Sequence, residues 1–390
     1  MINVAKPSYG ELARLFLRMS LSAFGGPVAH IALAEEEIVV RRKWLTREHF
    51  LDVVAATNLI PGPNSTEVMI HVGHVTRGIP GAILAGVCFI APSSLLTLAL
   101  AMLYVSSGTI PQINALLWGI KPVIVAIIAN VAYRFGATAL KERELWLLFG
   151  ISLALMLLLD VAEVIVMLGV GLLYALYLTR WRPPQSAALL AITLSPLLQA
   201  AQEVGARASL WDLFFYFLRI GSVLFGSGYL LIAYIQQDLV NTFGWLSARE
   251  VLDAIAIGQI TPGPVSTAAT VVGYIVAGVP GAFVATFGVF LPSFVLVILT
   301  APLLPGMRKS QFWSAFLAGV NVGVVAAIVV TLVDLGIAAL RTLDGAAFSP
   351  LAAAMMVGTL VLLLRTKINP TWLMLIGGAI GIAASALRIA

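Results

Sequence analysis

The sequence predicts an all-α polytopic membrane protein built from two inverted-topology repeats. Its 390 residues are 60% hydrophobic and only 11% charged, with a mean hydropathy of +1.01. A soluble fold of this length would need more polar surface. Apolar runs long enough to cross a bilayer fill most of both halves, and we expect about 10 to 13 membrane segments. A Pro-Gly-Pro motif interrupts an apolar run once in each half.

The two halves carry the same punctuating residues in the same order. Phe16-Leu17-Arg18 recurs as Phe217-Leu218-Arg219, and Pro92-Ser93 recurs as Pro292-Ser293. Glycines and prolines do not exchange freely as Leu and Val do, so this agreement indicates a duplicated unit. We predict a first transmembrane repeat over residues 1–182, a linker with room for an extra helix over 183–209, and a second transmembrane repeat over 210–390.

Basic residues change places between the repeats. In the first repeat they crowd the loops at 41–47 and 134–143, whereas in the second they appear at 308–309 and 365–367. Under the positive-inside rule, the two repeats therefore have opposite orientations, as in many secondary transporters. The same rule accounts for the net charge of +5, so we expect the lipid bilayer and no nucleic acid as a partner.

Each Pro-Gly-Pro motif is expected to break its helix, either as two half-helices or as a re-entrant hairpin. Proline has no N–H and glycine relaxes the backbone, so a new helix begins after the motif. Ser65 and Thr66, and likewise Ser266 and Thr267, fall in the first turn. Free N–H groups, the positive end of the helix dipole and these hydroxyls would suit an oxygen-rich anion at membrane depth. The alternative is that each motif is only a kink.

Charged side chains within apolar runs are candidates for binding or coupling. Arg18 and Arg219 occupy matching positions and could give bidentate hydrogen bonds to an oxyanion, or else reach an interface or pair with an acid. Lys121 is either a substrate or coupling charge or an interface residue. The candidates for proton coupling are Asp52, Glu67 and Asp253, with Glu35 and Glu36 also considered; the two aspartates could equally cap or pair near a helix end.

Metal, cofactor and catalytic chemistry are not expected. His71 and His74 have H-x-x-H spacing but lack further ligands, and Cys88 has no partner for a disulfide. No Walker-type ATP motif occurs. An intramembrane hydrolase would need Ser65 or Ser266 with a histidine, but all four histidines lie in the first half. We therefore expect a protein that is not an enzyme.

Several motifs together resemble one family. The string Phe24-Gly25-Gly26-Pro27, followed by Arg41-Arg42-Lys43-Trp44-Leu45 and by Pro61-Gly62-Pro63-Asn64-Ser65-Thr66, is similar to the chromate ion transporter family in its long-chain, two-domain form. The resemblance covers essentially the whole chain. It implies a multi-pass protein of the inner (cytoplasmic) membrane that exports chromate, driven by the proton motive force, with sulfate as a natural mimic. A passive oxyanion channel is the alternative, and a homodimer is left open.

The motifs and the resemblance together nominate a set of substrate-binding residues. They are Arg18, Phe24, Gly25, Gly26, Asn58, Pro61, Gly62, Pro63, Asn64, Ser65, Thr66 and Lys121 in the first repeat, and Arg219, Gly226, Gln259, Gly263, Ser266 and Thr267 in the second. Asn58 departs from the glutamine expected of the family. The second repeat has Ser227-Gly228 in place of Gly26-Pro27 and Val265 in place of Asn64, so we expect the first repeat to form most of the site.

Overall fold

The computed structural model describes residues 6–24, 26–106, 110–159, 161–180, 209–225, 228–301, 310–343, 345, 347–366 and 368–387, which form helices and no strand. The first half contains α1 (Tyr9–Ser22), α2 (Pro27–Glu35), the π-helix η1 (Glu36–Arg41), α3 (Arg47–Thr57), α4 (Asn64–Ser106), α5 (Pro111–Ala139), α6 (Arg143–Leu158) and α7 (Glu163–Leu178). The second half contains α9 (Leu210–Val223), α10 (Leu230–Tyr234), the π-helix η2 (Ile235–Thr242), α11 (Ala248–Ile260), the 3₁₀-helix η3 (Val265–Thr267), α12 (Ala268–Thr300), α14 (Gln311–Ala339), α15 (Pro350–Arg365) and α16 (Pro370–Ala386).

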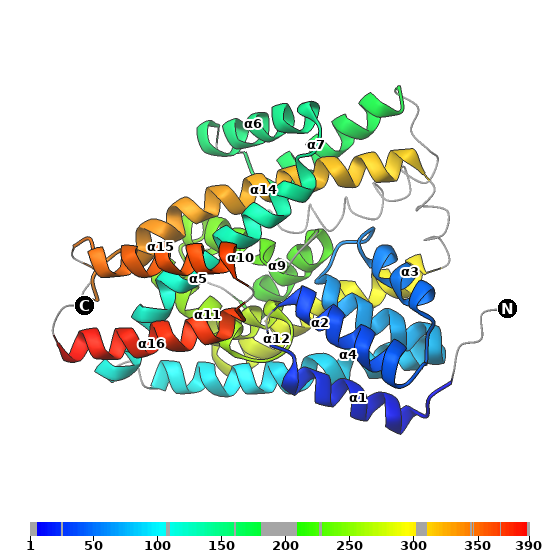
Figure 1. The fold of residues 1–390 in the computed structure, drawn as a ribbon, viewed down its shortest axis with the longest axis horizontal. Coiled ribbons are helices and arrows are strands. Elements are labelled where there is room, and N and C mark those ends of the chain that lie inside the picture. The colour runs from blue at the N-terminus through cyan, green and yellow to red at the C-terminus, as the bar shows by residue number, and fades with distance from the viewer. Residues whose placement is uncertain are drawn as a thin grey trace.

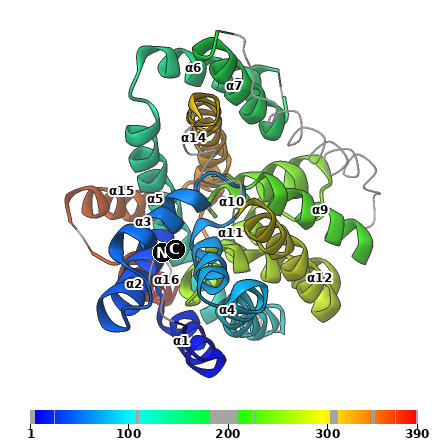
Figure 2. The same ribbon diagram turned by 90° about the vertical axis from the view of Figure 1, so that its right-hand side faces the viewer.

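The predicted all-α polytopic membrane protein is confirmed. Four helices within the described ranges are long and apolar enough to cross a membrane, namely α4, α5, α14 and the continuous segment formed by η3 and α12. Three shorter apolar helices are α7, α15 and α16. Figure 1 shows α14 and α16 running along the long axis of the molecule, and Figure 2, viewed at right angles, shows α1, α4, α12 and α14 nearly end-on.

The order of elements in the first half recurs in the second half, and the local signals recur with it. Ser8 and Glu11 form a capping box at the start of α1, and Ser209 and Asp212 form one at the start of α9. Each box satisfies two N–H groups that the first turn of a helix leaves without a partner. Each half also contains a π-helix before the helix that leads to its Pro-Gly-Pro loop. The repeat boundaries and the inverted orientation stay predictions, and the linker at 183–209 lies almost wholly outside the described residues.

A sharp kink divides both α4 and α12 at matching glycines. Gly78 and Gly278 have φ values of 65° and 63°, which favour glycine. In a straight helix, residues eight apart are about 12 Å apart along the axis. Here a Cβ on Gly73 would overlap the Gly81 carbonyl and lie 2.7 Å from Ala85 Cβ, so the backbones on both sides of the kink touch. Each Pro-Gly-Pro loop is therefore followed by a short helix that ends at the kink.

The last helices of each half pack on the other half. Helix α7 lies against α14, and α16 lies against α5. Glycines permit the close approach: a Cβ on Gly119 would meet the backbones of Gly377 and Gly381, and a Cβ on Gly319 would meet Gly171. Because each half covers apolar surface of the other, the halves form one folded unit rather than two separate domains.

Candidate functional site

Each Pro-Gly-Pro loop is hydrogen-bonded to the opposite half of the molecule. The Gly62 N–H donates to the Leu224 carbonyl at 2.7 Å, and the Gly263 N–H donates to the Ala23 carbonyl at 2.9 Å. Ala23 and Leu224 directly follow α1 and α9, so the two bonds join matching positions in a reciprocal way. These two glycine N–H groups therefore already have partners, and the Thr66 and Thr267 N–H groups donate to the Pro63 and Pro264 carbonyls. The donors for a ligand are the N–H groups that precede Thr66 and Thr267 in each first turn.

The duplicated Pro-Ser positions close the loops from the other side. A Cβ on Gly62 would lie 2.7 Å from Ser293 Oγ of α12, and a Cβ on Gly263 would lie 2.6 Å from Ser93 Oγ of α4. The Ser93 N–H also donates to the Ser20 hydroxyl oxygen, 3.2 Å away on α1. Each loop is thus packed between helices of both halves, and no side chain fits at either glycine. The recurrence of Pro92-Ser93 as Pro292-Ser293 in the sequence was the signal for Ser93 and Ser293.

His30 connects the first helix start to the second loop, and sequence reasoning missed it. Its Nδ1 lies 3.3 Å from Ser65 Oγ, and its Nε2 lies 3.2 Å from the same Ala23 carbonyl that accepts from Gly263. The side chain is fully buried. A chain of contacts therefore runs from Ser65, at the start of α4, to the second Pro-Gly-Pro loop. A lone histidine in an apolar helix beside the Gly26-Pro27 motif was the only available signal.

The predicted hydroxyl residues lie at the two helix starts and are buried. Thr66 Oγ1 and Ser266 Oγ have no hydrogen-bond partner among the described residues, whereas Thr267 Oγ1 donates to the Pro264 carbonyl at 2.9 Å. Asn64 Nδ2 donates to Asn58 Oδ1 at 2.8 Å, which joins two predicted residues across the first loop. Hydroxyls that lack partners inside a protein are available to a ligand.

The glycine motif after α9 lies close to the second helix start, and the one after α1 lies close to Tyr229 of the second half. Gly26 has a φ of 81°, and a Cβ there would lie 3.3 Å from the Tyr229 hydroxyl. A Cβ on Gly228 would lie 3.2 Å from Ser266 Oγ. Phe24 is partly exposed, and Gln259 Nε2 has no partner within the described ranges. Gly25 and Gly226, both predicted site residues, lie outside the described residues.

Lys121 forms a buried ion pair that joins the two halves. Its Nζ lies 2.8 Å from Asp253 Oδ1, and Tyr104 Oη donates to Asp253 Oδ2 at 2.9 Å. Both charged side chains are almost completely buried. Lys121 of α5 and Asp253 of α11 therefore neutralise each other's charge. The charge of Lys121 is therefore already offset before any anion binds.

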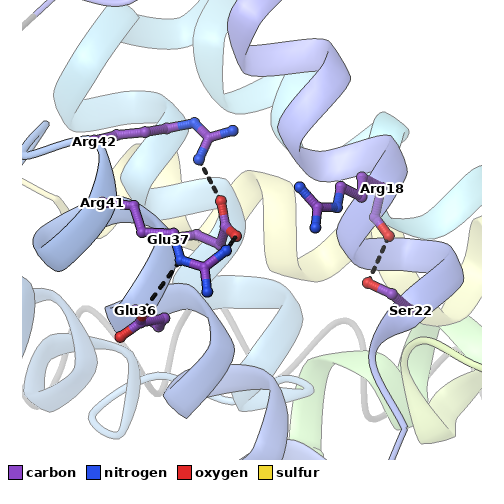
Figure 3. Close-up of polar contacts among 6 residues, drawn as sticks. All are labelled: Arg18, Ser22, Glu36, Glu37, Arg41 and Arg42. Atoms are coloured by element: carbon purple, nitrogen blue, oxygen red, sulfur yellow. Dashed lines mark hydrogen bonds and ion pairs between the residues drawn. The ribbon is translucent and has the colours of Figure 1, made fainter.

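The matching arginines Arg18 and Arg219 have different surroundings. Arg219 Nη2 pairs with Asp238 Oδ2 at 2.5 Å. The residue that matches Asp238 is Glu37, but it pairs with Arg41 at 3.1 Å and with Arg42. Figure 3 shows Arg41 and Arg42 converging on Glu37, while the guanidinium of Arg18 extends from α1 toward these three residues. Arg18 is exposed and takes part in none of the ion pairs found within the described part of the chain.

The three coupling candidates also differ in their surroundings. Asp52 is exposed on α3, and Asp253 is paired with Lys121. Glu67, near the start of α4, is 0% exposed, and neither of its carboxyl oxygens has a hydrogen-bond partner among the described residues. His71 and His74 lie near one another, with ring centroids 6.4 Å apart. No group of three or more His, Cys, Asp or Glu side chains gathers as a candidate metal site in the described ranges.

A hollow between α4 and α12 is apolar, unlike the surroundings of the two Pro-Gly-Pro loops. Its volume is about 330 Å³, and its lining is almost entirely apolar, including Phe283, Phe287 and Phe290. The hydroxyl residues in its wall are Ser94, Thr270 and Thr286. Such a lining does not offset the charge of an anion. Both Pro-Gly-Pro loops are themselves buried, whereas Asn64, the first residue of α4, is partly exposed beside the exposed Asn58.

Known proteins match nearly the whole chain. The family model described as "Chromate transporter" matches residues 10–175 and again 211–382, once in each half. The chain is 32% identical to the "Chromate transport protein" of Pseudomonas aeruginosa, over 84% of this chain and 81% of that one. It is 31% identical to the "Chromate transport protein" of Cupriavidus metallidurans, over 82% of this chain and 80% of that one.

A third relative gives the same result. The chain is 30% identical to the "Probable chromate transport protein" of Synechococcus elongatus, over 85% of this chain and 86% of that one. No solved structure matches the chain. The relatives are transport proteins rather than enzymes, as expected from the residues. The two-fold match of the family model and the extent of these similarities show that the chain belongs to the chromate transporter family.

Proposed function

We propose that this protein is a secondary active transporter that exports chromate, or a related tetrahedral oxyanion such as sulfate, across the cytoplasmic membrane. Transport proceeds by alternating access and is coupled to the proton motive force. The observation that carries the proposal is the reciprocal pair of hydrogen bonds from Gly62 to Leu224 and from Gly263 to Ala23. These bonds hold both broken-helix starts at the contact between the two halves, where secondary transporters bind their substrates.

The chemistry of the helix starts suits a doubly negative ion. The first-turn N–H groups and the dipole of α4 attract negative charge, and the second helix start offers the same groups. The hydroxyls of Thr66 and Ser266 are buried and have no hydrogen-bond partner in the part of the chain that the structure describes. Because Lys121 and Arg219 are paired with acids, Arg18 is the member of the matching arginine pair that offsets the charge of the ion as it enters. Arg219 is paired with Asp238 whereas Arg18 is in no ion pair of the described residues, and this difference supports a larger contribution of the first repeat to anion binding.

The burial of both loops supports a carrier rather than an open pore. In the proposed cycle one half moves relative to the other, which breaks the contacts of one buried loop while the other loop stays closed. The proposed motion is a rocking of the two halves about the Pro-Gly-Pro loops. This would expose the site first to one face of the membrane and then to the other.

Uptake into inverted membrane vesicles tests the transport activity. Chromate, sulfate and molybdate are compared with and without an imposed proton gradient, in vesicles with and without the protein. We expect saturable uptake of at least one of these ions that responds to the proton gradient. Flux that does not saturate and follows only the gradient of the ion would identify a passive oxyanion channel instead.

Arg18 provides the test of the site within the same assay. Arg18→Ala is expected to abolish oxyanion uptake, because it removes an arginine that has no other ion-pair partner within the described part of the chain. Arg14→Ala is the matched control, since Arg14 is an exposed arginine on the same helix, and it should retain uptake. Membrane insertion of both variants is checked by fluorescence-detected gel filtration. Unchanged uptake by Arg18→Ala would remove Arg18 from the site.

A further inference from the structure

Glu67 is a buried acid that exists in only one half of the molecule. Thr66 matches Thr267, so the position that matches Glu67 holds Ala268. The Glu67 side chain is 0% exposed, and both carboxyl oxygens lack hydrogen-bond partners among the described residues. A buried carboxylate without a partner is costly, so its presence needs a reason beyond packing.

The carboxyl group of Glu67 lies at the amino end of its own helix. It is packed against Gly62 of the first Pro-Gly-Pro loop, where any Cβ would overlap Oε1. Ser293 Oγ, from the second half, lies 2.7 Å from the same Cβ position and is also buried without a partner in the described ranges. The carboxyl group thus occupies the place at which the start of α4 and a hydroxyl of the opposite half would hold an anion.

The second helix start has no such internal acid. The space beside Gly263 is occupied by the Ser93 side chain and, at 3.4 Å, by the Ser20 carbonyl. Helix α12 contains no charged residue at all. Only the first helix start therefore carries a group that can switch between neutral and negative.

Other charged or titratable groups near α4 do not compensate Glu67. On the elements packed against α4, Glu11, Arg14 and Arg18 of α1 are exposed, His30 of α2 contacts Ser65, and Asp253 of α11 is paired with Lys121. The remaining such groups are Tyr9 of α1, Glu35 of α2, Arg47, Glu48, His49 and Asp52 of α3, Arg249 and Glu250 of α11, Tyr274 of α12, and His71, His74, Cys88, Tyr104 and Arg77 of α4 itself. None of those within the described part of the chain forms an ion pair or hydrogen bond with Glu67.

We propose that the Glu67 carboxylate and the transported oxyanion are alternative occupants of the start of α4, so that the ion binds only when Glu67 is protonated. This inference rests on the proposed function. Two negative groups at one buried helix start repel each other without the screening that water provides. Protonation turns Glu67 from a competitor of the ion into a neutral neighbour that can donate a hydrogen bond to it.

The proposal sets the direction of proton coupling. Since the ion-loaded carrier holds a proton on Glu67 and the empty carrier releases it, the proton and the oxyanion cross in the same direction. A doubly negative ion then moves with one positive charge, and a net negative charge leaves the cell. The membrane potential, negative inside, drives this export, while the pH gradient opposes it.

Equilibrium binding to the full-length purified chain in lipid nanodiscs tests the proposal. Radiolabelled sulfate and chromate are titrated over a pH series for the unmodified protein, Glu67→Gln and Glu144→Gln. Glu144 is an exposed acid on α6 and serves as the matched control. For the unmodified protein and the control, the dissociation constant is expected to rise by about tenfold per pH unit on the alkaline side. For Glu67→Gln, this part of the pH dependence should vanish and tight binding should persist at alkaline pH.

The variants distinguish a failure of the Glu67 inference from a failure of the proposed function. Protonation of the ion itself is the same for every protein, so only the difference between unmodified protein and Glu67→Gln reports on Glu67. If Glu67→Gln does not insert, Glu67→Ala replaces it, because Ala is the residue at the matching position of the second half. The same pH dependence with and without Glu67 would overturn the inference while leaving the proposed function intact. A lack of binding of both ions at every pH would overturn both.

Discussion

At the residue scale, duplication has preserved residue types while their partners have diverged. Arg18 and Arg219 match in sequence, yet only Arg219 has an acidic partner in the described structure. The reason is local: Glu37 stands where the second half has Asp238, and Arg41 and Arg42 hold it. The residues matching Arg41 and Arg42 are Thr242 and Phe243, which have no charge to compete for Asp238.

Lys121 allows a prediction about stability. Lys121→Ala leaves Asp253 buried beside Tyr104 without its counter-ion, and we expect a loss of about 3–5 kcal/mol in unfolding free energy. The double variant Lys121→Met with Asp253→Leu should recover most of that loss, since no buried charge then remains. Thermal unfolding of the purified variants in detergent measures both. Equal melting temperatures for the single and double variants would contradict the pairing.

The transport activity of the same double variant assigns the role of the pair. Transport that persists in it would identify the ion pair as a structural link between α5 and α11. Its loss, with the melting temperature restored, would mean that one of the two charges contacts the ion or takes part in coupling.

At the element scale, broken helices depend on glycines that tolerate no side chain. The kinks in α4 and α12 have the same backbone angles and the same contact between glycines on both sides. Each kink sets the direction of the short helix that begins at a Pro-Gly-Pro loop. The position of the helix start therefore depends on a contact far from the loop along the chain.

Gly73→Ala tests this dependence. The added methyl would overlap the Gly81 carbonyl, which is backbone and cannot move aside. We expect a loss of about 1–3 kcal/mol in stability and a larger fall in oxyanion uptake. Gly169→Ala is the control, because nothing lies within 4 Å of a Cβ there, and its stability should stay within about 1 kcal/mol of the unmodified protein. Equal behaviour of the two variants would show that the kink contact is not needed.

At the scale of the whole molecule, the two halves are held together by exchanged contacts. The last helix of each half packs on the long helix of the other, and each Pro-Gly-Pro loop bonds to the opposite half. Such reciprocal contacts are what a two-fold axis between repeats would produce. The opposite orientation of the repeats is still a prediction from loop charge.

Cysteine accessibility tests the orientation. In a Cys88→Ser background, Lys43→Cys reports on the loop at 41–47 and Asn241→Cys on the loop at 238–249; both positions are exposed. A membrane-impermeant thiol reagent applied to intact cells should label one of the two, and only permeabilised cells should show labelling of the other. Labelling of both from the same side would contradict the inversion.

The sequence by itself determined the class of the protein, because each of its signals is local or repeats along the chain. Apolar length predicted the membrane helices, and the paired glycines and prolines located the breaks and the duplication. The resemblance of these motifs to a family was confirmed over both halves. None of these conclusions depends on which helices are in contact.

Only the tertiary structure decided which residues act together. It brought Lys121 to Asp253, His30 to Ser65 and Ser293 to the space beside Gly62, across large separations in the chain. The physical reason is that a charge in an apolar environment takes its role from its partner, and the partner lies on another helix. Arg18 matches Arg219 in sequence, and Glu67 and Asp253 are both acids in apolar helices. In the described structure, packing gives a counter-ion to Arg219 and Asp253 but none to Arg18 or Glu67.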